Sequence, residues 1–411
     1  MLALFKFRKE MLILLGNIAD HFDTYLYVFL APVLAKLFFP NSNPVVSLIL
    51  SYSVLSSSIV TRPFGSYIFS VIAARSNPLD ALSYSLMGIG CATILIGILP
   101  SYNNIGIAAP ILLVILRMAK GVCAAGESAI AGLYIIDDKT DKPAIRRSYL
   151  YQSSTIIGII FASLVSTLVY YIDTANIWRV FFILGGVASI IGYVLRKKYN
   201  DSQSSQKKII HSLTEQANWR VLWNYRKTIL KIASVTSVSQ LTYVMPFVVM
   251  NYLVPLVTDI TLKDMMAINT LMLFFDLIAI PAIGELVSRY KPINLLKIAN
   301  LALMITILPI WYFLERSSLI YITYIRIWIV ICGIVFLCPL SIWCREQVIQ
   351  TKNKYLVVSM GYVLSSVLVG KLTPSICLII YHTTGSLIAV GGYFFVILLT
   401  CWAVLYSRFS I

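Results

Sequence analysis

The chain has 411 residues, of which 59% are hydrophobic and 12% charged, and its mean hydropathy is +0.84. Soluble globular proteins carry about 25% charged residues, so this composition excludes a soluble protein and predicts a polytopic membrane protein. The net charge of +16 does not indicate nucleic-acid binding, because the basic residues are spread over short loops between apolar stretches.

Twelve apolar segments follow in chain order, each long enough to cross a bilayer, for which a helix needs about 20 residues. They lie near 11–37, 45–72, 82–100, 105–136, 149–172, 177–195, 229–257, 264–288, 294–314, 319–344, 355–381 and 386–407. We therefore predict an all-α polytopic membrane protein with 12 transmembrane helices. A first six-helix half spans 1–195, a hydrophilic cytoplasmic loop spans 196–228, and a second six-helix half spans 229–411.

The distribution of Lys and Arg between the loops predicts the orientation, because cytoplasmic loops carry an excess of both. If both termini are cytoplasmic, the opposite side retains only Lys36, Lys263 and Arg316 among the flanking basic residues. Twelve helices in two halves with both ends inside are the plan of a major facilitator transporter.

The first segment carries two carboxylates, Asp20 and Asp23, with His21 and Tyr27 nearby. Residues three apart lie on adjoining parts of one helix face. Two carboxylates in a low-dielectric site repel each other, which favours uptake and release of a proton near neutral pH. Asp20 and Asp23 are therefore candidates for proton coupling, and Tyr27 for the substrate pathway. The alternative is that the carboxylates form ion pairs with basic residues of the fourth segment.

The fourth segment contains three charges within RMAKGVCAAGESAIAGLYI, at 117–135. A charge at the centre of a membrane helix costs about 2.5–3.5 kcal/mol, so Arg117, Lys120 and Glu127 must face the bundle interior, water or one another. At about 100° per residue they share one broad face. Glu127 is a candidate for proton coupling, and the two cations are candidates for the substrate pathway. Alternatively, Glu127 neutralises Lys120 or a charge on another helix.

Buried charges return in the second half as Asp276, Arg326 and Lys371. Asp276 and Arg326 could pair across the bundle, and Lys371 could attract a substrate carboxylate. Tyr243 could contact a quaternary amine through a cation–π interaction. All four are candidates for the substrate pathway.

Four blocks of sequence carry a resemblance. They are GNIADHFDTYLYVFLAPVLAKLFFP at 16–40, TRPFG at 61–65, SYNNIGIAAPILLVILRMAKGVCAAGE at 101–127 and MGYVLSSVLVGKLTP at 360–374. In content and order they resemble the metabolite:H⁺ symporter family of the major facilitator superfamily, and within it the proline/betaine (osmolyte) symporters. The resemblance implies the major facilitator fold, and it supports Arg117 and Glu127, where the family keeps an Arg and a Glu.

The resemblance also implies a charged latch at the cytoplasmic ends of the helices. The gating candidates are Arg62, Gly65, Arg75, Asp80 and Asp137. The family has an acid in the loop where Ala74 stands here, so Asp80 is a possible substitute. The chain also departs from the family by placing His21 at a Trp position, Lys120 at a Gln and Lys371 at a Gly.

We therefore predict a proton-coupled secondary active symporter that imports a small polar metabolite by alternating access, with a proline/betaine-type osmolyte as the first candidate. A dicarboxylate or α-keto acid:H⁺ symporter is the alternative favoured by the surplus of interior cations. A diverged paralogue with a sensing role or lost transport is favoured by the altered loop at 73–80. The expected setting is a bacterial inner membrane, with a functional monomer surrounded by lipid and no nucleic-acid partner.

The sequence contains no set of residues that predicts an enzyme. The seven Cys and three His show no metal-ligand spacing, and no nucleotide-binding loop or Ser-His-Asp set occurs. We expect no metal and no cofactor, with the proton as the coupling ion.

Overall fold

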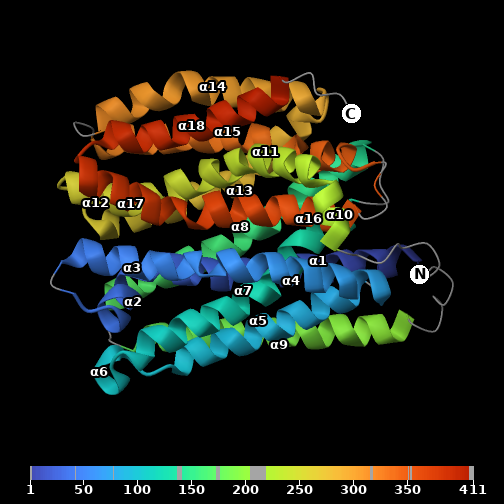
Figure 1. Ribbon diagram of the computed structural model, residues 1–411, viewed down its shortest axis with the longest axis horizontal. Helices are drawn as coiled ribbons and strands as arrows, with labels where there is room; N and C mark the ends of the chain where they lie inside the picture. Colours follow the sequence, from blue (N-terminus) through green and yellow to red (C-terminus); the bar gives the residue numbers. More distant parts are fainter. Residues whose placement is uncertain are drawn as a thin grey trace.

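The computed structural model describes residues 2–41, 43–76, 78–136, 141–172, 176–203, 219–314, 318–349, 351 and 354–406. Within these residues the chain is almost entirely helical and contains no strand. Figure 1 shows the long helices lying side by side along one common direction.

The helices up to residue 203 occupy one side of the bundle (Figure 1). They are α1 (Leu2–Phe29), α2 (Ala31–Phe38), α3 (Pro44–Ser56), α4 (Ser58–Arg75), α5 (Pro78–Ile98), α6 (Tyr102–Ile105), α7 (Ala108–Tyr134), α8 (Asp141–Ile172) and α9 (Ile177–Gln203). α9 continues beyond residue 195, where the sequence predicted the central loop to begin.

The remaining helices form the other side of the bundle. They are α10 (Trp219–Asn224), α11 (Arg226–Val244), α12 (Met250–Val257), α13 (Leu262–Val287), α14 (Pro292–Phe313), α15 (Leu319–Glu346), α16 (Lys354–Ser365), α17 (Thr373–Thr384) and α18 (Leu387–Tyr406). Among the described residues of this side, two π-helical segments interrupt the helices: η2 (Met245–Val249) joins α11 to α12, and η4 (Ser366–Lys371) leads from α16 towards α17. Such segments often occur at functional sites.

Eleven helical segments among the described residues are long and apolar enough to cross a membrane. The predicted first span is the exception. Polar residues in α1, including Asn17, Asp20 and Asp23, lower its hydropathy, yet α1 packs along α8 and α9 within the bundle. Its continuation is broken at Leu30, and α2 begins with Pro32 in its first turn, where a missing backbone N–H costs nothing. The predicted all-α polytopic fold is confirmed.

The helices run between two ends of the molecule (Figure 1). α1 begins and α18 ends at one end, which we call the terminal end, and α6 lies at the other, the distal end. α2, which carries Lys36, and the connection from α12 to α13, next to Lys263, lie at the distal end. Arg179, in the first turn of α9, is a further basic residue there, and it donates hydrogen bonds to the carbonyls of Gly97 (3.1 Å) and Leu99 (2.5 Å) at the end of α5.

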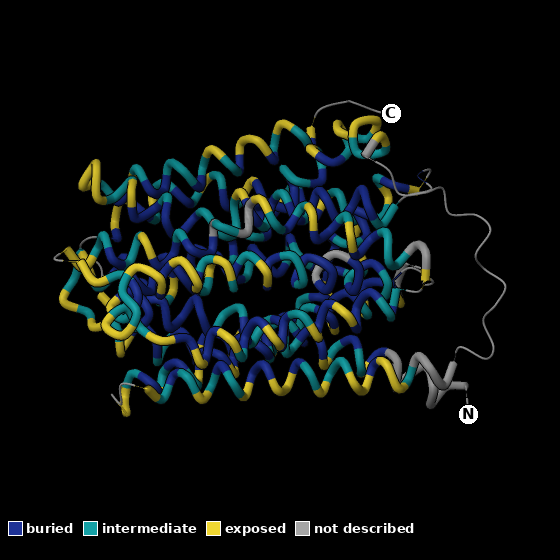
Figure 2. The backbone as a smooth tube through the Cα atoms, turned by 60° about the horizontal axis from the view of Figure 1, so that its bottom comes forward, coloured by how far each residue is buried: buried dark blue, intermediate teal, exposed yellow. Residues whose placement is uncertain are grey.

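Exposed residues recur along the outer faces of the helices, while the interior is buried (Figure 2). Many of the exposed side chains are large and apolar, including Leu271, Ile278 and Ile298, which are 64–71% exposed. Apolar side chains facing outward are what a lipid environment requires, because the bilayer core offers no water.

Hydrogen bonds connect the two sides of the bundle at both ends. Near the distal end, the Tyr252 hydroxyl of α12 donates to the carbonyl oxygens of Val28 (3.2 Å) and Phe29 (2.8 Å) in α1. Towards the terminal end, the Tyr149 hydroxyl of α8 donates to Glu285 in α13 at 3.4 Å. The space between the two sides is therefore bounded by contacts at either end.

Close packing of α4 on α7 depends on Gly65, because a Cβ at this position would overlap the backbone carbonyl of Val122. We predict that Gly65→Ala forces the two helices apart and lowers the free energy of unfolding by about 1–3 kcal/mol, as overpacking does in other cores. Thermal unfolding of the purified protein in detergent measures the effect. Gly392→Ala in α18 is the matched control, since its Cβ would meet no atom within 4 Å. Equal melting temperatures for the two variants would contradict the prediction.

Candidate functional site

Two neighbouring cavities lie between the two sides of the bundle. The first cavity has a volume of about 140 Å³ and the second about 130 Å³. Both are lined by His21 and Tyr25 of α1, Gln240 of α11 and Tyr362 of α16. Helices from both sides of the bundle therefore contribute to one polar region at the centre of the molecule.

The second cavity contains three charged residues, Asp20, Arg62 and Lys371. Asp20 is 3% exposed, and its Oδ1 has no hydrogen-bond partner among the described residues. Arg62 of α4 donates from Nη1 to the hydroxyl of Ser366 in η4 at 2.8 Å, across the two sides of the bundle, while its buried Nε has no partner in the described part of the chain. Lys371, at the end of η4, forms no ion pair with any described residue.

Two more cations of α7 lie beside this cavity. A small space of about 10 Å³ is bounded by Arg117, Lys120 and Lys371, among others. Lys120 forms an ion pair with Asp23 of α1, and both side chains are almost completely buried. The Arg117 guanidinium lies 4.1 Å from the centre of the Tyr27 ring, and its buried Nη1 has no hydrogen-bond partner among the described residues.

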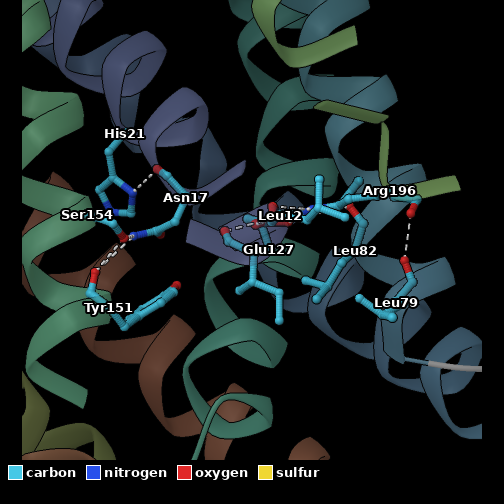
Figure 3. Close-up of polar contacts among 12 residues, drawn as sticks. Leu12, Asn17, His21, Leu79, Leu82, Glu127, Tyr151, Ser154 and Arg196 are labelled. Carbon is cyan, nitrogen blue, oxygen red and sulfur yellow. Dashed lines mark hydrogen bonds and ion pairs between the residues drawn. The ribbon is translucent and has the colours of Figure 1, made fainter. Parts of the chain in front are cut away.

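Glu127 is held by Arg196 of α9 in a two-pronged ion pair (Figure 3). Arg196 Nη2 lies 2.6 Å from Oε1, and Nη1 lies 2.7 Å from Oε2. The same guanidinium donates to the backbone carbonyls of Leu12 (3.0 Å), Ile13 (3.1 Å) and Leu82 (3.0 Å). Both charged side chains are fully buried, and this pair joins α1, α5, α7 and α9.

Gly16 makes room for this ion pair, because a Cβ there would overlap the Arg196 guanidinium. Ser85 of α5 adds a hydrogen bond to Glu127 Oε2 at 3.2 Å. A buried charge pair is stable only when its remaining donors and acceptors are also satisfied. These contacts satisfy that condition for Glu127 and Arg196.

The charged face of α7 is thus divided among three contacts. Arg117 stacks on Tyr27, Lys120 pairs with Asp23, and Glu127 pairs with Arg196. The sequence left open whether these charges line a pathway or neutralise others. For Lys120 and Glu127 the structure provides a direct partner on another helix. The Tyr27 ring packs against the Arg117 guanidinium. Its hydroxyl donates a hydrogen bond to the backbone carbonyl of Ser51 at 3.1 Å.

The first cavity is aromatic and polar. Tyr243 lies edge-to-face on Tyr25 with ring centres 5.7 Å apart, and its buried hydroxyl has no hydrogen-bond partner among the described residues. Tyr151 and Gln152 of α8 form another part of the wall. Tyr243 therefore lines the first cavity, and its role in the substrate pathway stays a prediction.

Asp276 and Arg326 are both buried, but the structure does not pair them. Arg326 Nη2 donates to Asn251 Oδ1 at 2.9 Å and to Asn269 Oδ1 at 2.6 Å. Neither charged residue lines the two central cavities. The sequence-based hypothesis paired Arg326 with the Asp276 carboxylate. In the structure the side-chain amides of Asn251 and Asn269 accept the hydrogen bonds of Arg326 instead.

The gating candidates are widely separated. Arg62 does not close its helix as expected, because α4 continues 13 residues further to Arg75 and leaves Arg62 at the second cavity. Gly65 provides the close α4–α7 contact. Asp80 lies in the first turn of α5, where a carboxylate is favoured by the helix dipole. The Arg75 side chain and Asp137 lie outside the part of the chain that the structure describes.

Arg196 is the principal residue that the sequence reasoning missed. It begins the basic run RKK at 196–198, which was attributed to membrane orientation. A weak signal was available, since Glu127 needed a buried cation and Arg196 directly follows an apolar segment.

Removing one member of the Glu127–Arg196 pair should be worse than removing both charges. We predict that Arg196→Gln costs about 3–5 kcal/mol of stability, because it leaves the Glu127 charge buried without its partner. The double variant Glu127→Gln/Arg196→Gln should recover part of this loss. Thermal unfolding of the two single variants and the double variant measures the coupling, with Lys197→Gln on the exposed side of α9 as the control. Additive losses would contradict a direct interaction.

Comparison with known proteins agrees with this architecture. The sequence pattern of the Major Facilitator Superfamily matches residues 13–348. The chain is 24% identical to an alpha-ketoglutarate permease of Escherichia coli K12, over 86% of this chain and 83% of that protein. It is 30% identical to the proline/betaine transporter of the same organism, over 47% of this chain and 40% of that protein.

The fold is also that of a solved transporter. The proton:xylose symporter XylE of E. coli superposes with a TM-score of 0.71 and 14% sequence identity, over 98% of this chain and 95% of that one. The predicted resemblance is confirmed by the family match and by the named relatives. The chain belongs to the Major Facilitator Superfamily, and it is a multi-pass membrane transporter rather than an enzyme.

Proposed function

We propose that this protein is a proton-coupled symporter for a small carboxylate anion, with a dicarboxylate or α-keto acid as the preferred solute. The observation that carries the proposal is the surplus of buried cations around the second cavity. Arg62, Lys371, Arg117 and Lys120 face two carboxylates, Asp20 and Asp23, and Lys120 is already paired with Asp23.

The unpartnered donors support an anionic solute. Arg62 Nε and Arg117 Nη1 are buried without hydrogen-bond partners among the described residues. An unsatisfied donor on a buried charged group costs more than one on a neutral group. A carboxylate matches a guanidinium in geometry and charge, so a bound dianion would satisfy these donors and offset the mutual repulsion of the cations.

The named relatives support two solute classes. The alpha-ketoglutarate permease matches along most of both chains, whereas the match to the proline/betaine transporter covers less than half of either. A zwitterionic osmolyte has no net charge and would leave the cation surplus in place. The cavity therefore favours the dicarboxylate alternative over the osmolyte that the sequence blocks put first.

Asp20 is the proposed proton-coupling residue. It borders the second cavity and has no ion pair with any residue that the structure describes, while Asp23 and Glu127 are each paired with a cation. A carboxylate that is free of a fixed partner can take up and release a proton during the cycle. In this proposal Glu127 anchors the helices of the first half, and Asp23 holds Lys120 in place.

Alternating access would come from movement of the half at 1–195 relative to the half at 229–411, around the midplane cavities. The Tyr252 contacts would open on the distal side and the Tyr149–Glu285 contact on the terminal side. We place the terminal end in the cytoplasm of a bacterial cell, since the basic residues concentrate there.

Lys371 provides a test of the solute class. We predict that wild-type proteoliposomes exchange labelled α-ketoglutarate more rapidly than proline or glycine betaine. Lys371→Gln should raise KM for the anion by about 10-fold, equivalent to 1.4 kcal/mol, while Lys371→Arg should restore most of the affinity. Lys263→Gln, at the distal end, is the control for loss of a lysine charge. Preferential exchange of proline or betaine by the wild type would refute the anion proposal.

Asp20 provides a test of proton coupling. We predict that Asp20→Asn abolishes accumulation driven by an inward proton gradient but preserves solute exchange at equal pH, because exchange needs no net proton movement. Both are measured with the labelled solute that the wild type exchanges best. Asp259→Asn, on an exposed loop residue, should behave as wild type. Full gradient-driven accumulation by Asp20→Asn would contradict the assignment.

A further inference from the structure

His21 occupies the junction between the two cavities. It follows Asp20 on α1, lines both cavities, and is partly exposed to them. Gly158 of α8 lets α1 approach closely here, since a Cβ at Gly158 would overlap the Ile18 carbonyl and lie 3.1 Å from the Cβ of His21. The packing of α1 on α8 thus fixes the backbone that carries this imidazole.

One ring nitrogen of His21 is held by the backbone. Nδ1 lies 2.9 Å from the carbonyl oxygen of Asn17 (Figure 3). A carbonyl oxygen only accepts, so this contact assigns the hydrogen to Nδ1 and leaves Nε2 as the basic nitrogen of the neutral ring. Asn17 is itself fixed by donation to Ser154 Oγ and Thr155 Oγ1, both at 2.8 Å.

The two cavities differ in their titratable groups. The second cavity contains Asp20, with Arg62 and Lys371 opposite. The lining of the first cavity contains no Asp, Glu, Lys or Arg among the described residues. Histidine is the side chain whose ordinary pKa lies closest to neutral, and His21 is the histidine on this wall.

The groups that surround the imidazole come from several elements. Those of the cavity walls are Asp20 and Tyr25 on α1, Arg62 on α4, Tyr151 on α8, Tyr243 on α11, Cys344 on α15, Tyr362 on α16 and Lys371 on η4. Glu127 on α7 also acts on His21 electrostatically, but its charge is compensated by Arg196. Asp20 is therefore the neighbouring carboxylate without an ion-pair partner in the described structure.

We propose that His21 carries the proton between Asp20 and the first cavity, a role that rests on the proton coupling proposed above. The protonated Asp20 carboxyl gives its proton, through water in the cavity, to Nε2 of His21. Asp20 becomes a carboxylate and His21 an imidazolium, which still donates from Nδ1 to Asn17. The imidazolium then releases the Nε2 proton to water in the first cavity, and both residues return to their starting charge after Asp20 is reprotonated.

The transport test uses His21→Asn. Asparagine places an amide nitrogen close to the position of Nδ1, so it can keep the hydrogen bond to Asn17, but it has no group that titrates. We expect loss of gradient-driven accumulation with retention of equal-pH exchange. His382→Asn, on an exposed residue at the distal end, is the matched control and should accumulate as the wild type does. Accumulation by His21→Asn at the wild-type level overturns the proposal.

A second measurement needs no transported solute. In protein carrying His211→Gln and His382→Gln, nitrogen-15 NMR of labelled histidine in liposomes reports on His21 alone. We expect Nε2 to gain and lose a proton as the pH is varied, because a neutral imidazole has one basic nitrogen, with a midpoint displaced by Asp20→Asn but not by Asp259→Asn. An Nε2 that does not titrate, or a midpoint insensitive to Asp20→Asn, overturns the proposal. Failure of the wild type to transport any tested anion would instead refute the proposed function, and the NMR titration would still decide the role of His21.

Discussion

A charge inside a membrane bundle must be compensated by protein, because the bilayer core cannot solvate it. α7 carries three charged residues, and each contacts a different kind of partner. Arg117 lies on the Tyr27 ring, Lys120 pairs with Asp23, and Glu127 pairs with Arg196. All three contacts are made by one face of α7, with Tyr27 and Asp23 on α1 and with Arg196 on α9. The packing of the first half therefore has to satisfy these charges in addition to burying apolar side chains.

The sequence predicted the helices well because hydropathy depends on composition along a segment and needs no knowledge of its neighbours. It also identified the common face of Arg117, Lys120 and Glu127, since helical periodicity alone determines that relation. The approximate position of the site followed from the same reasoning. Charged residues in apolar segments converge on the interior because lipid excludes them.

Pairing between helices was harder to predict. It depends on the depth and rotation of each helix, which hydropathy does not specify. Arg62 was assigned to a helix end because the resemblance of TRPFG to the family implied it, although the predicted span at 45–72 continues beyond it. The structure instead places Arg62 at a cavity. Arg326 was expected to pair with a carboxylate, and it instead donates hydrogen bonds to the side-chain amides of Asn251 and Asn269. Arg196 was overlooked because its basic neighbours offered a simpler explanation.

The close contact of α4 with α7 at Gly65 also has an electrostatic consequence. It places Arg62 on α4 and the α7 cations on the same side of the bundle in tightly packed helices, whereas Lys371 belongs to the opposite side. Like charges on two moving bodies resist approach, and the resistance grows as water leaves the gap. In a carrier without bound solute, repulsion between Lys371 and the cations of the first half would therefore oppose closure of the space between the two sides. The valence of the bound solute, acting as a counter-charge between the two bodies, would then set how readily the loaded carrier closes and crosses between its two faces.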